Sequence, residues 1–276
     1  MNKQGLSRTV VHAALILYTL IACGPILLII FNSFKVRKAI FSSPLSLPNA
    51  ETFSLIGYET VLAKADFGGY FVNSLITTAG SLFFVLLFGA MAAWALVEYR
   101  FRGVTWLALF MAIGIMVPIR LGSVSILRMM VDLGLVNNLW SLILVYTAMG
   151  LPLAIFILGE FMQQVPRELR DAARCDGVNE YKIFFAVIVP LIRPAIATVA
   201  VFTMVPIWND LWFPLILAPG RSTQTVTLGV QQFVGQYQTD WNGVISALTL
   251  AIAPILILYV IFSRSLIRGL TAGAVK

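Results

Sequence analysis

A short segment between two long apolar runs, residues 165–178, is rich in charged and small residues. Pro166 suits the first position of a helix, and Glu168 and Asp171 place negative charge in its first turns, where the helix dipole favours it. Gly177 is a natural stop for such a helix. The spacing predicts a short charged helix whose chemistry is ionic docking into a cleft of a partner, with a solvated loop helix as the alternative.

Small side chains follow the acidic residues of this segment. Ala172 and Ala173 leave room for another backbone to come close, and Asp176 precedes the stop at Gly177. Asn179 belongs to a residue type that caps helices, so we expect a second helix to begin there and to continue into the next apolar run. The whole segment is therefore predicted to form a helix, a glycine bend and another helix.

The chain lacks the residue patterns of common catalytic and metal sites. No G-x-x-x-x-G-K-[ST], G-x-S-x-G or H-E-x-x-H occurs, and Cys23 and Cys175 form no C-x-x-C pair. We expect both cysteines to be unpaired thiols and the single histidine, His12, to lie at the membrane interface. The chain is predicted to bind no metal, to hydrolyse no ATP and to be no enzyme.

The composition is typical of a membrane protein. Of the 276 residues, 59% are apolar and 11% are charged, and the mean hydropathy is +0.91. A soluble fold of this length has too little interior for so many apolar side chains, which disfavours a soluble enzyme, a disordered tail and a nucleic-acid-binding domain. The net charge of +7 then indicates basic loops that fix membrane orientation, and no nucleic-acid partner is expected.

Six apolar runs are long enough to be candidate transmembrane helices. They cover residues 10–34, 70–97, 104–119, 139–161, 184–207 and 243–262. The first run is too long for the apolar part of a signal peptide, which predicts a retained anchor. The predicted fold class is therefore all-α, a polytopic membrane protein with six transmembrane helices.

An even number of spans puts both termini on one side of the membrane, and the basic residues indicate which side. Eleven of the 19 Lys and Arg residues lie on the side of the termini and seven on the other side, with Arg193 near the first group. This excess predicts cytoplasmic N- and C-termini. Arg128 and Asp132, spaced i,i+4 before the fourth run, predict a structural ion pair.

The segment at residues 165–178 resembles the EAA loop of the permease subunits of ABC importers. The family pattern is Glu-Ala-Ala, three residues, Gly and, further on, Ile-x-Leu-Pro. Here it reads Asp171-Ala172-Ala173, Gly177 and Ile188-Val189-Pro190, with Asp in place of Glu and Val in place of Leu. Trp208-Asn209-Asp210 is similar to the outer end of the fifth span in carbohydrate permeases, and Arg268–Lys276 resembles the tail of the six-span maltose-type subunit.

The resemblance implies a type I ABC importer permease fold and a subunit of an ATP-driven, binding-protein-dependent importer for a di- or oligosaccharide or a glycoside. The implied partners are a second permease in a heterodimeric pore, two ATPase subunits and an extracytoplasmic sugar-binding protein, in the bacterial inner membrane. This chain would bind no cofactor, since ATP and Mg would be held by the partner ATPase.

The resemblance also implies roles for individual residues and a division of the chain. The ATPase-coupling residues would be Glu168, Asp171, Ala172, Ala173, Asp176 and Gly177. The tail near Gly273 and Lys276 is expected to approach the ATPase dimer. The implied parts are an N-terminal helix and extracytoplasmic loop (1–69), a transmembrane core (70–265) with the coupling loop at 163–182, and a cytoplasmic tail (266–276).

Polar groups at membrane depth mark a candidate translocation path. Asn73 lies near the start of the second run, and Trp208, Asn209 and Asp210 lie where the fifth run meets the outer side. Aromatic faces stack on the C–H surfaces of sugars and amides bond to their hydroxyls. The alternative is that Trp208 anchors the chain at the interface and that Asn209 ends a helix. Disaccharides, oligosaccharides, glycosides and polyol-like solutes all remain open as substrates.

Two other classes of membrane protein compete with this interpretation. A stand-alone secondary transporter or channel would show internal inverted repeats and buried titratable residues. An intramembrane enzyme would need a catalytic pair at membrane depth. The sequence shows no convincing repeat, few acidic residues within the runs and one peripheral histidine, so the permease is the preferred prediction.

Overall fold

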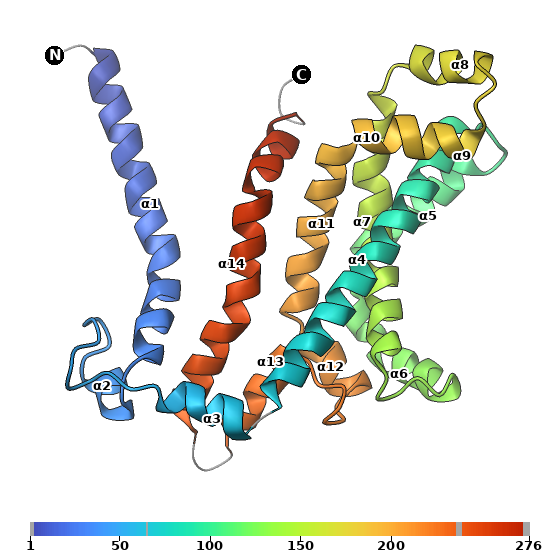
Figure 1. The fold of residues 1–276 in the computed structure, drawn as a ribbon. Helices are drawn as coiled ribbons and strands as arrows, with labels where there is room; N and C mark the ends of the chain where they lie inside the picture. The colour runs from blue at the N-terminus through green and yellow to red at the C-terminus, as the bar shows by residue number, and fades with distance from the viewer. Residues whose placement is uncertain (1–2, 65, 236–238, 273–276) are drawn as a thin grey trace. The chain divides into compact units, whose positions relative to one another are not determined.

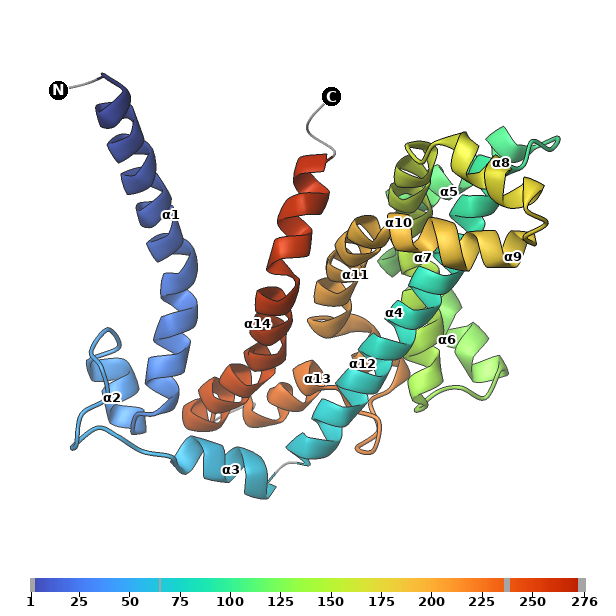
Figure 2. The same cartoon turned by 45° about the horizontal axis from the view of Figure 1, so that its top comes forward.

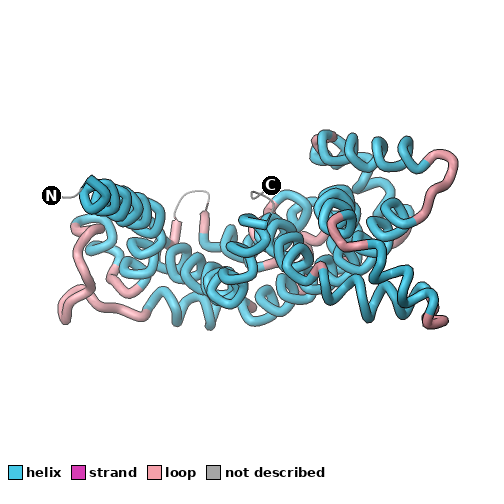
Figure 3. Tube along the Cα trace, turned by 90° about the horizontal axis from the view of Figure 1, so that it is seen from above, coloured by secondary structure: helices cyan, strands magenta, loops and turns pink. Residues whose placement is uncertain are grey.

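Every regular element in the described part of the chain is a helix. The computed structural model describes residues 3–64, 66–235 and 239–272 (Figure 1). Within these ranges the extended pairings are two isolated bridges, between Lys35 and Phe53 and between Val234 and Thr239, and Figure 3 shows helices and loops alone. The predicted all-α fold class is confirmed.

The helices follow one another along the chain with short connections. In chain order they are α1 (Lys3–Ser33), α2 (Arg37–Ser42), α3 (Ile56–Lys64), α4 (Phe67–Glu98), α5 (Val104–Met116), a 3₁₀ turn (Ile119–Gly122), α6 (Ser123–Asp132), α7 (Leu139–Gln163), α8 (Arg167–Cys175), α9 (Glu180–Ile183), a π-helical turn (Phe184–Ile188), α10 (Val189–Leu191), α11 (Arg193–Trp208), α12 (Trp212–Leu217), α13 (Val226–Val230), a 3₁₀ turn (Gln231–Phe233) and α14 (Trp241–Ala272).

Three helices are long and apolar enough by themselves to cross a membrane, namely α1, α4 and α7. Two further candidates are bent pairs, Val104–Met116 with Ile119–Asp132 and Glu180–Leu191 with Arg193–Trp208. Helix α14 runs from Trp241 to Ala272, with a described apolar part up to Ile257. All six predicted runs are therefore helical, and two of them are broken.

The third predicted run was expected to continue to Ile119, but α5 ends at Met116 and the chain then bends by 86°. The cause is Pro118, which restricts Val117 to an extended conformation and has no backbone N–H to donate. The predicted ion pair that follows is wrong, because no ion pair joins Arg128 to Asp132 among the described residues. Both side chains are exposed, and a base placed before an acid is the weaker order on a helix.

The fifth predicted run, 184–207, is not one straight helix either. The segment Glu180–Leu191 meets α11 at an angle of 76°. Ile192 at the bend has φ −94° and ψ 12°, and Pro194 cannot donate the hydrogen bond that would continue the helix. The EAA-like segment therefore leads into a stretch, α9–α10, that is turned away from the axis of α11 (Figure 1).

The chain forms two compact units. The first comprises residues 1–68 and 229–254, and the second comprises residues 69–228 and 255–276. In the second unit, α8 and α9–α10 lie together at one end, and α6 and α12 lie at the other end (Figures 1 and 2). The division expected from the family, at 69 and 265, stays a prediction.

Close approach of α4 and α7 holds the second unit together. Gly89 on α4 faces Ala154 on α7, where an added Cβ would collide with the Ala154 methyl group. Gly150 on α7 leaves the same kind of space for the methyl groups of Val85. Small residues at helix crossings allow this close packing in membrane proteins. The buried side chains Leu158, Met162 and their neighbours continue this core toward α8.

A buried lysine organises the loop after α1 in the first unit. The Lys35 ammonium donates to Asn32 Oδ1 at 3.1 Å and to the Ser43 carbonyl at 2.9 Å, and Asn242 on α14 donates to the Lys35 carbonyl at 2.8 Å. Burial lowers the pKa of Lys35. Lys35 therefore holds α1, its following loop and the start of α14 in contact.

Candidate coupling loop and translocation path

Helix α8 forms as the charge pattern predicts. It spans Arg167–Cys175, with Pro166 directly before its first residue. Gly177 has φ +74°, a conformation that glycine adopts without strain, and ends the helix there. The side chain of Asn179 accepts a hydrogen bond from the Lys182 backbone N–H at 2.8 Å and caps α9. The predicted helix, bend and second helix are confirmed.

One face of α8 is open to solvent. Glu168, Asp171, Ala172 and Cys175 are exposed, and their spacing of i, i+3, i+4 and i+7 places them on one side of the helix. We call these four residues the α8 outer face. The two acidic residues make this face negative, and Ala172 keeps its centre flat. The predicted unpaired state of Cys175 is confirmed, as is that of Cys23 on α1.

The opposite face of α8 is packed inward. Ala173 packs against the core that α4, α7 and α9 share, and Arg170 is almost completely buried, with 3% of its side chain exposed. The two alanines predicted to act together therefore face different ways: Ala172 lies on the outer face, and Ala173 packs, partly buried, against the core. Asp176 and Gly177 are exposed at the bend.

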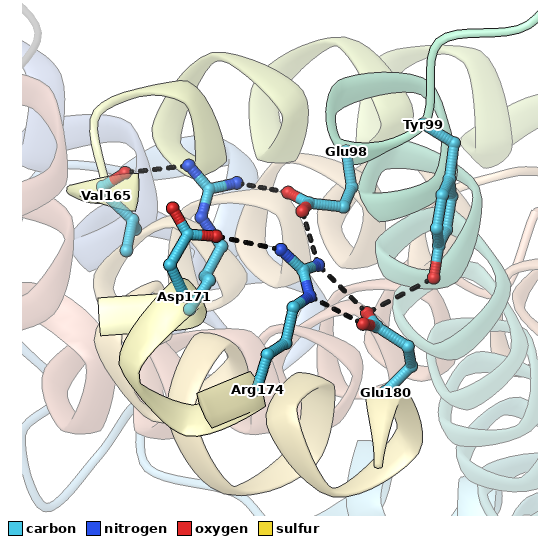
Figure 4. A network of polar contacts seen from close by, with 7 residues as sticks. Glu98, Tyr99, Val165, Asp171, Arg174 and Glu180 are labelled. Atoms are coloured by element: carbon cyan, nitrogen blue, oxygen red, sulfur yellow. Dashed lines mark hydrogen bonds and ion pairs between the residues drawn. The ribbon is translucent and has the colours of Figure 1, made fainter. Parts of the chain in front are cut away.

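A network of ion pairs fixes α8 to its neighbours (Figure 4). Glu98, the last residue of α4, accepts from Arg170 and from Arg174, each at 2.5 Å. Arg174 also contacts Glu180 on α9 at 2.7 Å and Asp171 within α8 at 3.1 Å. Arg174 thereby joins three helices, and α8 is held as a rigid extension of α4 and α9.

Arg170 is satisfied on several sides although it is buried. It donates to the Val165 carbonyl at 3.1 Å in addition to its ion pair with Glu98. Its guanidinium carbon lies 5.7 Å from the centre of the Trp94 ring, a favourable cation–π distance. A buried charge requires such partners, because removing it from water is otherwise expensive.

The network shifts the titration of its members. The hydrogen bonds from Arg174 lower the pKa of Glu180. Partial burial, followed by the charge of Glu180, raises the pKa of Tyr99, whose hydroxyl lies 3.2 Å from that carboxylate. Hydrogen bonds to Glu180 and Glu98 raise the pKa of Arg174. The charged forms of Glu180 and Arg174 are therefore favoured at neutral pH.

The predicted path residues occupy different environments. Asn73 on α4 donates to the carbonyls of Ser222 and Gln224, at 2.9 and 3.0 Å. It thus ties the start of α4 to the loop after α12. Trp208 is buried and contacts Phe71 edge to face, with ring centroids 5.7 Å apart. Asn209 is exposed and donates to the Val205 carbonyl at 2.9 Å, as expected of a helix end.

Asp210 has the densest set of polar contacts of the four predicted path residues. Its carboxylate accepts from the Tyr146 hydroxyl at 2.8 Å, from the Phe213 backbone N–H at 3.1 Å and from Arg120 at 3.2 Å. The Trp212 side chain bonds to Ser123 on α6 at 2.8 Å. Asp210 therefore joins α7, α12 and the turn before α6.

A cavity of about 180 Å³ adjoins this carboxylate. Asp210, Tyr146 and Arg120 line it together with Thr203, whose buried hydroxyl has no partner within the described residues. The other lining side chains are mainly apolar, as in ligand pockets generally. Asp210 lines this cavity, whereas the other three residues predicted for the path, Asn73, Trp208 and Asn209, do not.

Sequence reasoning missed the partners of these residues. Glu98, Arg120 and Tyr146 were not among the predicted site residues. The sequence did contain a signal for Glu98. A carboxylate at the end of an apolar run needs a basic partner, so an ion pair could have been expected there. The tail near Gly273 and Lys276 lies outside the described residues.

The sequence matches the model of a known family over almost its full length. The family is described as "Binding-protein-dependent transport system inner membrane component", and residues 4–272 match it. The diacetylchitobiose uptake system permease protein NgcG of Streptomyces coelicolor is 32% identical over 96% of this chain and 88% of that protein. The melibiose/raffinose/stachyose import permease protein MelC of Bacillus subtilis is 31% identical over 95% of each chain.

A solved structure has the same fold. The crystal structure of a bacterial ABC transporter involved in the import of the acidic polysaccharide alginate contains a chain that matches with a TM-score of 0.81. The match covers 96% of this chain and 98% of the other, at 20% sequence identity. The two broken spans and the α8 loop thus belong to a fold that is known among transport permeases.

Proposed function

The chain belongs to the family of binding-protein-dependent transport system inner membrane components, and from this premise we propose that it imports an oligosaccharide or a related glycoside. Its relatives NgcG and MelC are named for the uptake of diacetylchitobiose and of melibiose, raffinose and stachyose. The cavity beside Asp210 supports a carbohydrate, because it combines hydroxyl and carboxylate groups with apolar walls.

The α8 outer face is the docking surface for a cytoplasmic ATPase in this proposal. The observation that carries this proposal is the ion-pair network on the opposite side of α8. There Arg174 of α8 pairs with Glu98 of α4 and with Glu180 of α9. Rigid-body closure of a motor is transmitted only through a stiff connector. Glu168 and Asp171 would meet basic groups of the ATPase, and Ala172 would lie at the point of closest approach.

The remaining parts of the importer follow from this assignment. A second, different permease would complete the pore, two ATPase subunits would hold ATP and Mg, and an extracytoplasmic protein would deliver the sugar. This chain would be non-catalytic. The end that carries α8 would face the cytoplasm, together with both termini, in agreement with the excess of basic residues on that side.

Replacement of Ala172 by Glu tests the docking surface. We expect the Ala172→Glu subunit to insert and fold, because residue 172 is exposed, and to lose co-purification with the ATPase and uptake of sugar. Gln164→Glu is the matched control, since it adds the same charge at an exposed position before α8. Uptake of labelled diacetylchitobiose and raffinose into proteoliposomes containing the complete importer measures transport. Normal ATPase binding by Ala172→Glu would refute the coupling role.

A further inference from the structure

A second, larger cavity lies between α4, α5, α7 and the start of α8. Its volume is about 540 Å³, within the range of pockets that hold small organic ligands. Tyr99 and Arg170 of the ion-pair network border this space, but none of the candidate path residues lines it. Figure 2 shows α5, α7 and α8 together at this end of the second unit.

The wall of this cavity is apolar. Ala108, Met111 and Ala112 of α5 line one side, and Pro152, Ile155 and Phe156 of α7 line the other. None of the residues of α5 is buried, and 57% of Phe156 is exposed. In a membrane such a wall contacts hydrocarbon, and the small side chains of α5 leave room for an acyl chain.

The rim of the same cavity is cationic. Arg100 after α4 and Arg167 at the start of α8 line it, and neither forms an ion pair within the described part of the chain. Glu160 contributes one opposing charge, and Tyr99 and Gln163 contribute neutral polar groups. Two unpaired guanidinium groups against one carboxylate leave a net positive rim that suits a phosphate group.

Arg170 supplies a further donor beside the cavity. It is among the lining residues, and its Nε–H has no hydrogen-bond partner within the described residues although the atom is buried. Buried donors are normally satisfied, so an unpaired one indicates an acceptor that the protein itself does not provide.

We propose that this cavity binds an anionic glycerophospholipid of the cytoplasmic leaflet, with the phosphate at Arg100 and Arg167 and one acyl chain along α5 and α7. The assignment of this end to the cytoplasm rests on the proposed function. Basic pockets between transmembrane helices on that side are suited to anionic headgroups. A phospholipid matches both parts of the cavity, because its acyl chain suits the apolar wall and its phosphate suits the cationic rim. Because Arg167 begins α8, the bound lipid would also stabilise the position of α8.

Lipid retention by the purified, assembled importer tests this site. Native mass spectrometry after exchange into vesicles that contain phosphatidylglycerol and phosphatidylcholine is expected to show phosphatidylglycerol bound to this subunit. The double variant Arg100→Ala, Arg167→Ala should weaken that binding roughly thirtyfold, if each arginine contributes the interaction typical of a basic residue near an anionic lipid surface. Ala108→Trp, which fills the apolar wall, should also displace the lipid.

The matched control is Arg102→Ala with Lys182→Ala, which removes two exposed basic residues that do not line the cavity. Equal retention in the cavity variant and the control would overturn the proposal, as would equal binding of phosphatidylcholine. Absence of lipid together with a permease or ATPase subunit cross-linked to position 108 would assign the cavity to a protein interface instead. Retention is measured without transport, so these outcomes are independent of whether sugar uptake is observed.

Discussion

Arg174 on α8 lies 2.5 Å from Glu98 at the end of α4, and this contact joins two segments that are 76 residues apart in the chain. The same carboxylate binds Arg170, which is buried. A single acidic residue thus forms ion pairs with two basic residues of the loop. The loop that is proposed to meet the ATPase is therefore continuous, through side chains, with a membrane-spanning helix.

Replacement of Glu98 by Gln should destabilise the protein strongly. The change leaves Arg170 buried with no carboxylate, and breaking a buried pair in this way costs about 3 kcal/mol or more. We expect a lower thermal midpoint of the purified subunit and a loss of sugar uptake. Glu160→Gln is the control, because Glu160 is exposed and forms no ion pair within the described residues. Similar midpoints for the two variants would contradict a central role of Glu98.

Glu180 predicts a specific pH dependence. Its folded-state pKa is lowered, so its contribution to stability is fully present above the ordinary glutamate value of 4.5 and is lost as the pH falls through the lowered value. Glu180→Gln should therefore be less stable than the wild type at pH 7, and the difference should shrink as the pH falls below 4.5. Thermal midpoints measured from pH 7 to pH 3.5 test this; a difference that stays constant with pH would contradict it.

Substitutions at Gly177 isolate the cost of backbone strain, because an added side chain would not collide with neighbouring atoms. The φ of Gly177 is +74°, and an added Cβ would meet no atom within 4 Å. Gly177→Ala should cost about 1 kcal/mol from the left-handed conformation alone. Gly177→Asn should cost less, because Asn tolerates this conformation better than other residues with a side chain. Uptake should fall in the order Gly, Asn, Ala; equal activity of the three would show that the bend does not need this conformation.

Local signals in the sequence were sufficient to predict the helix, bend and second helix around Gly177. Pro166, Gly177 and Asn179 act through the backbone of their own segment, so their roles are readable from neighbours in the chain. The bends at Pro118 and Ile192 were harder to predict. A proline within an apolar run is compatible with a kinked helix or with a complete break, and tertiary packing decides between them.

Long-range partners could not be predicted. Glu98 meets Arg174, and Asp210 meets Tyr146 and Arg120, only because the helices pack in one particular arrangement. The two alanines of the EAA-like segment look equivalent in sequence, yet the rotation of α8 packs Ala173, partly buried, against the core and exposes Ala172. That rotation is set by the ion pairs on its inner side.

Asp210 and its neighbour Asn209 provide a paired comparison. Asp210→Asn keeps the size of the side chain but removes the charge that holds Arg120, and it replaces an oxygen acceptor of Tyr146 or Phe213 by a donor. We expect a loss of about 2 kcal/mol in stability and reduced sugar uptake. Asn209→Ala removes one exposed helix-end bond and should have little effect on either. Comparable uptake defects in both variants would favour a surface at Asn209 over the Asp210 cavity.

Gly150 should be intolerant of any larger residue because α4 and α7 touch at this point. A Cβ there would lie 2.7 Å from a methyl group of Val85 and 3.1 Å from the Thr203 methyl group, so the helices would have to separate. Gly150→Val is therefore expected to lower stability by about 1–3 kcal/mol, the range for overpacking a dense core. Gly24→Val on α1 adds the same side chain where no atom lies within 4 Å, and it should insert and fold normally. The comparison requires only thermal midpoints of the two purified variants. Because both changes raise apolarity equally, a selective loss at Gly150 would identify close helix approach, rather than membrane insertion, as the reason for glycine at that position.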